Sequence, residues 1–170
     1  RALVRTLARE RIAPRAAEID ASHEFPWDVV ELFRDHEVFG LIFDEQFGGT
    51  GTGTLLALVA IEEVSKVCAT SALILASQEL GSLGLKLAGN EEQKQRYLPR
   101  LASGEWLCAY ALTESGSGSD SAAMRSTVFS RTSAGERPST SRTSRFAAFT
   151  ACGPPATIAS PSAMAAAVET

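Results

Sequence analysis

Residues 89–106 read Gly89-Asn90-Glu91-Glu92-Gln93-Lys94-Gln95-Arg96-Tyr97-Leu98-Pro99-Arg100-Leu101-Ala102-Ser103-Gly104-Glu105-Trp106, and this stretch predicts where a helical region ends. Asn90 followed three residues later by Gln93 is the pattern of a helix N-cap with a capping box. We expect Pro99 and Gly104 to end that helix. The next residues, Trp106 to Leu112, are apolar and aromatic, as is typical of a β-strand.

Upstream of this stretch, the apolar residues recur at helical spacing. The first helix carries one apolar stripe, and Pro14 should kink or split it. A second helix should begin near Glu24–Asp28, with Pro26 in its first turn. The short apolar run Val38–Phe43 fits either a strand or a buried connector. Residues 47–53 are rich in glycine and predict a flexible loop. The stripe of the first helix consists of Leu3, Val4, Leu7, Ala8, Ile12, Ala16 and Ile19.

Two further helices, from Thr54 to about Val67 and from Ser71 to Ala88, are apolar nearly all round, which predicts that both are buried in a bundle. The fold class expected from the sequence is therefore mainly α. A helical bundle should occupy residues 1–104, and an incomplete β domain should begin in residues 105–126.

The composition changes abruptly after residue 126. The first 126 residues contain 17 leucines and carry a net charge of −6, whereas the last 44 contain no leucine and carry +2. Such a segment has few large apolar groups to offset the entropy cost of ordering. We expect residues 127–170 to lie outside the domain, as a disordered tail or a stretch read out of frame, with few contacts to the bundle.

Composition and motifs exclude several classes of function. The net charge of −4 over 170 residues argues against nucleic acid or an anionic membrane as the main partner, and no apolar run is long enough to span a membrane. The chain carries no signal-peptide pattern. Its three cysteines, about 40 residues apart, indicate reduced thiols and a cytoplasmic location rather than a disulfide framework.

Specific catalytic and binding motifs are also missing from the sequence. His23 and His36 stand apart from the cysteines, and each is expected at the surface or a helix end, so no metal site is predicted. The serine hydrolase elbow and the P-loop lysine motif do not occur, and the glycine offsets after Gly48 fail the dinucleotide-binding pattern. The adjacent Glu62 and Glu63 should point to different helix faces, one in a buried salt bridge and the other in solvent.

One motif does indicate chemistry: Tyr110-Ala111-Leu112-Thr113-Glu114-Ser115-Gly116-Ser117-Gly118-Ser119-Asp120. It joins the predicted strand to a Gly/Ser turn, whose backbone N–H groups and hydroxyls suit a flat ring edge or a pyrophosphate. Together with residues 89–106 it resembles the acyl-CoA dehydrogenase family of flavoenzymes. The similarity extends upstream, through residues 11–20, Phe25-Pro26-Trp27 and the turn at residues 43–51, and covers residues 1 to about 126.

The resemblance implies an FAD-dependent oxidation of an acyl-CoA thioester to the 2-enoyl-CoA. It assigns cofactor-binding roles to Tyr110, Leu112, Thr113, Gly118 and Ser119. Ser119 would also approach the CoA moiety, and Gln78 would line the acyl pocket. The implied partners are an electron-transfer flavoprotein and further copies of the chain in a tetramer. The catalytic glutamate belongs to a C-terminal domain that the match does not reach, so no catalytic residue is assigned.

Some residues depart from the family pattern, and other functions stay open. Ser115 and Ser117 replace a proline and an alanine, and Glu37 stands where a helix-ending glycine is common, which should strain the turn. The alternatives are a flavin-dependent acyl-CoA oxidase, a monooxygenase-like relative, and a helical interaction module without catalysis.

Overall fold

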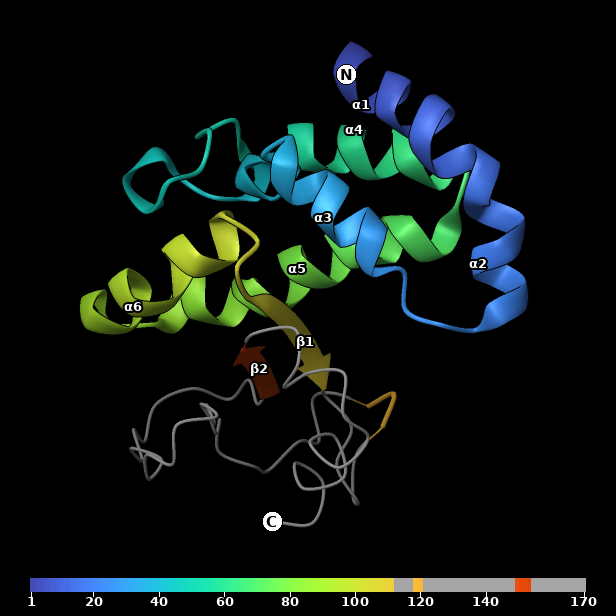
Figure 1. Cartoon of the computed structure of the whole chain (residues 1–170). Coiled ribbons are helices and arrows are strands. Elements are labelled where there is room, and N and C mark those ends of the chain that lie inside the picture. Colours follow the sequence, from blue (N-terminus) through green and yellow to red (C-terminus); the bar gives the residue numbers. More distant parts are fainter. Residues whose placement is uncertain (112–117, 121–148, 154–170) are drawn as a thin grey trace.

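The computed structural model of the chain describes residues 1–111, 118–120 and 149–153 (Figure 1). Helices α4 and α5 lie side by side at the centre, α1 packs on α4, and the strands pack on α5. The described residues are mainly helical, as predicted. The elements are α1 (Ala2–Leu7), α2 (Ala16–Ser22), α3 (Trp27–Asp35), α4 (Gly53–Ser65), α5 (Ala69–Ala88), α6 (Glu91–Ala102), β1 (Leu107–Ala111) and β2 (Phe149–Gly153).

The N-terminal helix is interrupted around Pro14, as expected. A π-helical stretch, Ala8–Ile12, follows α1, and a 3₁₀ turn, Ala13–Arg15, precedes α2. Proline has no N–H to donate and its ring crowds the preceding turn, so the regular i to i−4 pattern fails here. The apolar stripe nevertheless continues through the break, because Leu7, Ile12 and Ile19 are all buried in the same core cluster.

The run whose secondary structure the sequence left open, Val38–Ile42, is a 3₁₀ helix and therefore a buried connector. Glu37, just before it, has φ 54° and ψ 26°, so the expected strain at this position is present. The connector delivers Phe39 into the core, where its ring meets that of Phe33 edge-on at 5.9 Å.

Most of the glycine-rich segment at residues 47–53 is a loop, as predicted, and backbone hydrogen bonds hold part of it. Thr50 N–H donates to Gly40 O at 2.9 Å, and Gly51 N–H donates to Phe43 O at 3.1 Å. Gly49 approaches so closely that an added Cβ would lie 2.0 Å from Phe43 O. Glycine at this position is thus required for backbone packing.

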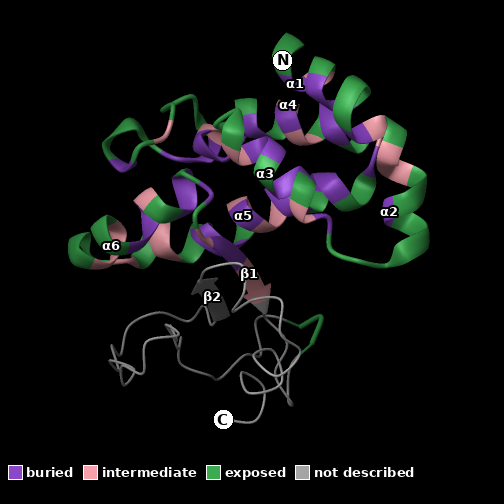
Figure 2. Ribbon diagram, viewed as in Figure 1, coloured by how far each residue is buried: buried purple, intermediate pink, exposed green. Residues whose placement is uncertain are grey.

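The two apolar central helices are only half buried, which corrects the expectation that both are enclosed by the bundle. On α4, only Ala57, Ala60, Glu63 and Val64 are buried. Leu55 and Leu58 remain 74% and 54% exposed, and on α5 Leu73 and Leu87 are 63% and 78% exposed. Figure 2 shows buried and exposed residues alternating along both helices. Because α4 and α5 are apolar on nearly every face, their sequences could not indicate which face the neighbouring elements cover.

Helix α6 begins with the predicted capping box. The Asn90 side chain accepts from Gln93 N–H at 2.8 Å, and the Gln93 side chain accepts from Asn90 N–H at 3.0 Å. Pro99 lies inside the helix rather than at its end, which corrects the expected boundary. The helix ends at Ala102, and Gly104 follows with φ +73°.

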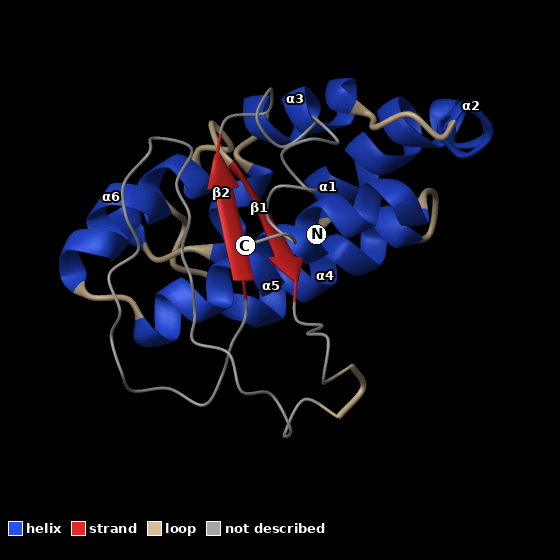
Figure 3. Ribbon diagram, turned by 90° about the horizontal axis from the view of Figure 1, so that it is seen from below, coloured by secondary structure: helices blue, strands red, loops and turns tan. Residues whose placement is uncertain are grey.

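The predicted strand at 106–112 is present as β1, and it pairs with β2 in an antiparallel ladder (Figure 3). The two strands lie across α5. From the leucine-free segment the structure describes Phe149–Gly153, which pairs with β1 and packs on α5. The expectation that the segment as a whole makes few contacts with the bundle stays a prediction. The remainder of residues 127–170 lies outside the described residues.

Among the described helices, none is both long enough and apolar enough to cross a membrane.

Candidate functional site

The side chain of Gln78 ties three elements together. Its Nε2 donates to Leu101 O and to Trp106 O, each at 3.0 Å, and its Oε1 accepts from Cys108 N–H at 2.8 Å. Gln78 is 1% exposed, so these bonds are formed away from water. An amide in an apolar surrounding must find such partners, and here they are the backbone of α6, of the α6–β1 connection and of β1.

Strand β1 is held close to α5 by Gly81. A Cβ added to Gly81 would lie 2.9 Å from Cys108 Cβ and 3.0 Å from Cys108 Sγ. Only a residue without a side chain lets the strand approach the helix this closely. Sequence reasoning missed Gly81, although a glycine inside an apolar helix is the signal that could have indicated a close backbone approach.

Some of the residues predicted to bind the cofactor lie in the described part of the chain, and others lie outside it. Tyr110 is half-buried on β1, and alternation along the strand puts it on the same face as Cys108, toward α5. Gly118 and Ser119 are exposed. Leu112 and Thr113, together with Glu114, lie outside the described residues. The strand thus turns Tyr110 toward α5, while the relation of Tyr110 to the Gly/Ser turn stays a prediction.

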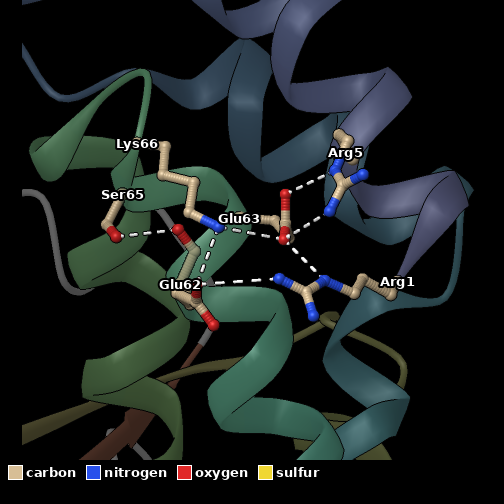
Figure 4. Close-up of polar contacts among 6 residues, drawn as sticks. All are labelled: Arg1, Arg5, Glu62, Glu63, Ser65 and Lys66. Atoms are coloured by element: carbon tan, nitrogen blue, oxygen red, sulfur yellow. Dashed lines mark hydrogen bonds and ion pairs between the residues drawn. The ribbon is translucent and has the colours of Figure 1, made fainter.

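The adjacent carboxylates Glu62 and Glu63 lie on different faces of α4, one buried in salt bridges and the other exposed, as predicted. The Glu63 side chain is 2% exposed, whereas that of Glu62 is 53% exposed. Arg5 Nε lies 2.8 Å from Glu63 Oε2, Arg1 Nε lies 2.7 Å from Oε1, and Lys66 Nζ lies 3.1 Å from Oε1 (Figure 4). Hydrogen bonds from Arg5, then Arg1 and Lys66, hold the pKa of Glu63 well below its usual range.

This cluster joins α1 to α4 and is unsuited to proton transfer, because a carboxylate with so low a pKa stays ionised. The two histidines cap helices and are exposed, His23 after α2 and His36 after α3. Within the described residues, no three His, Cys, Asp or Glu side chains gather as a metal ion would need.

Comparison with known proteins identifies the class to which this fold belongs. Residues 1–105 match the family model described as acyl-CoA dehydrogenase, N-terminal domain. An acyl-CoA dehydrogenase of Bacillus subtilis is 39% identical over 132 residues, covering 77% of this chain and 35% of the relative. Cyclohex-1-ene-1-carbonyl-CoA dehydrogenase of Syntrophus aciditrophicus is 42% identical, covering 72% of this chain and 30% of the relative.

A solved structure agrees with these relatives. A chain from the study of the electron-transferring flavoprotein of Acidaminococcus fermentans and flavin-based electron bifurcation superposes with a TM-score of 0.63 at 27% identity. The superposition covers 78% of this chain and 34% of the other. This chain belongs to the acyl-CoA dehydrogenase family, a family of FAD-dependent oxidoreductases. It spans about a third of the length of the curated relatives.

Proposed function

We propose that this chain supplies the helical domain and the first flavin-binding segment of an enzyme that oxidises an acyl-CoA to the 2-enoyl-CoA. The observation that carries the proposal is the anchoring of β1. Gln78 and Gly81 fix the strand on α5, and the strand runs directly into the segment Tyr110–Ser119 that resembles the family's flavin-binding stretch.

The donor chemistry of that segment fits a flavin. Its glycines and serines offer backbone N–H groups and hydroxyls, which suit the polar edge of the ring and the pyrophosphate. Among the described residues, nothing lies within 4 Å of a Cβ added at Gly118, which leaves room for a ligand on that side. Tyr110, Leu112, Thr113, Gly118 and Ser119 would hold the cofactor, with Ser119 also near the CoA moiety.

The chemistry that bound FAD would supply is acceptance of the hydride that leaves the β carbon of the substrate. The residues of this chain would hold and orient the cofactor and the substrate. Thr113 would form a hydrogen bond to the ring edge, Leu112 would pack along the ring, and α5 would form a wall of the acyl pocket. All polar hydrogens of the Gln78 amide are already used within the protein. Gln78 would therefore serve the pocket by positioning β1 while its stem lines the wall.

Proton removal from the α carbon needs a base that we place outside these 170 residues, in the C-terminal domain of longer family members. Loss of a general base costs about 10²–10⁴ in rate. The isolated chain should therefore bind FAD poorly and fail to oxidise acyl-CoA. In the complete enzyme we propose a cytoplasmic homotetramer that passes electrons to an electron-transfer flavoprotein.

An oxidase or a monooxygenase-like relative is the alternative catalytic assignment. The two relatives described above are both named as dehydrogenases, and this favours the dehydrogenase. In a helical interaction module without catalysis, the Gly/Ser segment would only connect other elements. A flavin titration distinguishes this alternative, because such a module would bind no flavin.

A chimera tests the proposal. Residues 1–126 would replace the matching part of the Bacillus subtilis acyl-CoA dehydrogenase, and anaerobic flavin bleaching would be followed with a series of acyl-CoAs. We expect bleaching by the chimera, a much weaker flavin affinity after Thr113→Val, and no effect of Thr6→Val, an exposed control on α1. A folded chimera that binds no flavin would refute the assignment of Tyr110–Ser119.

The isolated 170-residue chain supplies the complementary measurement. We expect no bleaching when FAD and acyl-CoA are added to it. Bleaching at a rate near that of full-length family members would show that a base is present after all. Glu114 would then be the candidate, and Glu114→Gln should abolish the reaction.

A further inference from the structure

Helices α4 and α5 expose leucines on one common side of the pair. The helices lie side by side (Figure 1), and Thr54 Oγ1 of α4 donates to Glu79 Oε1 of α5 at 3.4 Å. Because only residues 66–68 join the end of α4 to the start of α5, while Thr54 reaches Glu79, the two helices run antiparallel. Leu55 and Leu80 each directly follow a residue of this contact. At 3.6 residues per turn, both therefore point to the same side of the pair.

The exposed leucines of α5 recur at the spacing of a helix–helix contact. Leu73, Leu80 and Leu87 stand seven residues apart, and Leu83 falls between the last two. Such a stripe is what one helix presents to another that packs nearly along it. The core already uses the opposite side of α5, whose buried residues include Ile74, Leu75 and Gln78. Helix α5 thus has a second side that is built for packing.

Helix α4 extends the same surface, because Leu58 lies about one turn beyond Leu55. Together these exposed side chains offer on the order of 500 Å² of leucine surface. The largest apolar patch on a typical monomer is about 300–600 Å², and each partner of a stable interface buries about 800 Å². The leucines alone therefore supply more than half of what a dimer needs. We call them the leucine face: Leu55, Leu58, Leu73, Leu80, Leu83 and Leu87.

The charges and the symmetry of the leucine face suit a second copy of the chain. In a symmetric dimer the same surface meets itself, so an excess of one charge would repel. Glu62 and Lys66 continue the exposed side of α4, and they cancel as an ion pair at 2.7 Å. On α5, Leu73 and Leu87 lie at equal distances from Leu80. A two-fold axis at Leu80 would therefore bring leucine against leucine.

We propose that the 170-residue chain by itself forms a symmetric dimer in which the leucine face of one copy packs on that of a second. Two antiparallel helix pairs packed face to face make a four-helix arrangement, which buries the apolar side of each pair. The dimer applies to this chain alone, because a complete enzyme would need α5 as a wall of the acyl pocket. It does not rest on the proposed function, and it is measured without flavin or acyl-CoA.

Sedimentation equilibrium of the full chain in reducing buffer tests the proposal. At a concentration of about 100 μM we expect a mass near twice the 18.0 kDa of one chain, with dissociation on dilution. Leu80→Lys, at the centre of the leucine face, should raise the dissociation constant by about tenfold or more. Leu87→Lys provides a second disrupting variant on the same face. Leu3→Lys, at an exposed leucine of α1, is the control and should leave the constant within about twofold of the wild type. Circular dichroism checks that the helices of each variant are retained.

Several results would overturn the proposal. A wild-type chain that stays monomeric over the whole concentration range would show that the leucine face does not pair with itself. Growth beyond a dimer would exclude the symmetric contact. Folded Leu80→Lys and Leu87→Lys chains that dimerise as well as the wild type, or an equal loss in Leu3→Lys, would place the contact elsewhere. A monomer that co-sediments with phosphatidylcholine vesicles would identify lipid as the occupant instead.

Discussion

Gln78 Oε1 accepts a hydrogen bond from the backbone N–H of Cys108 at 2.8 Å, and this contact fixes the first strand on the longest helix. The same amide donates to two carbonyls, so one side chain satisfies three backbone groups. No buried side-chain polar atom in the described part of the chain lacks a partner. Removal of this amide would leave the backbone N–H of Cys108 and the carbonyls of Leu101 and Trp106 without this partner.

Gln78→Met keeps the side-chain length and removes all three hydrogen bonds. We expect a loss of roughly 1–3 kcal/mol in the free energy of unfolding, because buried backbone groups lose their partners. Urea denaturation measures it, with Gln95→Met on the exposed face of α6 as the control. Equal stability of the two variants would mean that water replaces the amide without cost.

Two glycines on α5 should respond oppositely to alanine. In Gly81→Ala the new Cβ would lie within 3.0 Å of Cys108, and relief of this overlap should destabilise the chain by about 1–3 kcal/mol. No described residue has an atom within 4 Å of a Cβ added at Gly84, so Gly84→Ala should stabilise the helix by about 0.5–1 kcal/mol. Thermal unfolding compares them, and a shift of the same sign in both would contradict the close approach of β1.

Glu37→Gly should stabilise the chain. Glu37 has φ 54°, in the left-handed region that costs a residue with a Cβ about 1 kcal/mol or slightly more. Glu31→Gly, in the interior of α3, should instead cost about 1 kcal/mol. Chemical denaturation of both variants measures the two changes in the free energy of unfolding. The backbone at position 37 should favour glycine, whereas the helical position 31 should disfavour it.

The cluster around Glu63 should make stability depend on pH at the acid end. The folded-state pKa of Glu63 is depressed, so its contribution is fully present above its unfolded pKa of about 4.3. That contribution is lost progressively as the pH falls below about 5 toward the lower folded pKa. The melting temperature of the wild-type chain should fall over this window.

Glu63→Gln should lower the melting temperature at neutral pH and remove part of that acid dependence. Glu62→Gln, at the exposed neighbouring position, should have a much smaller effect at neutral pH. Parallel stability curves for Glu63→Gln and the wild type between pH 5 and pH 2 would show that Glu63 is not the group responsible.

Local signals in the sequence were sufficient for features that neighbouring residues determine. The Asn90–Gln93 capping box and the interruption at Pro14 each depend on residues only a few positions apart, whereas the strain at Glu37 was expected from the departure from the family pattern. The capping side chains and the missing proline N–H act on the adjacent turn of helix. The order of residue types is therefore enough to predict these two features. The same holds for the opposed faces of Glu62 and Glu63.

The sequence by itself determined the helical class, the order of the elements and the resemblance to acyl-CoA dehydrogenases over residues 1 to about 126, because helical periodicity and short motifs are local properties. Only the tertiary structure decided which faces of α4 and α5 are covered, that Gln78 bonds the backbone of three segments, and that Phe149–Gly153 pairs with β1. These features join residues far apart in the chain, and no local pattern encodes the close approach that Gly81 allows or the register that places Cys108 opposite Cys152.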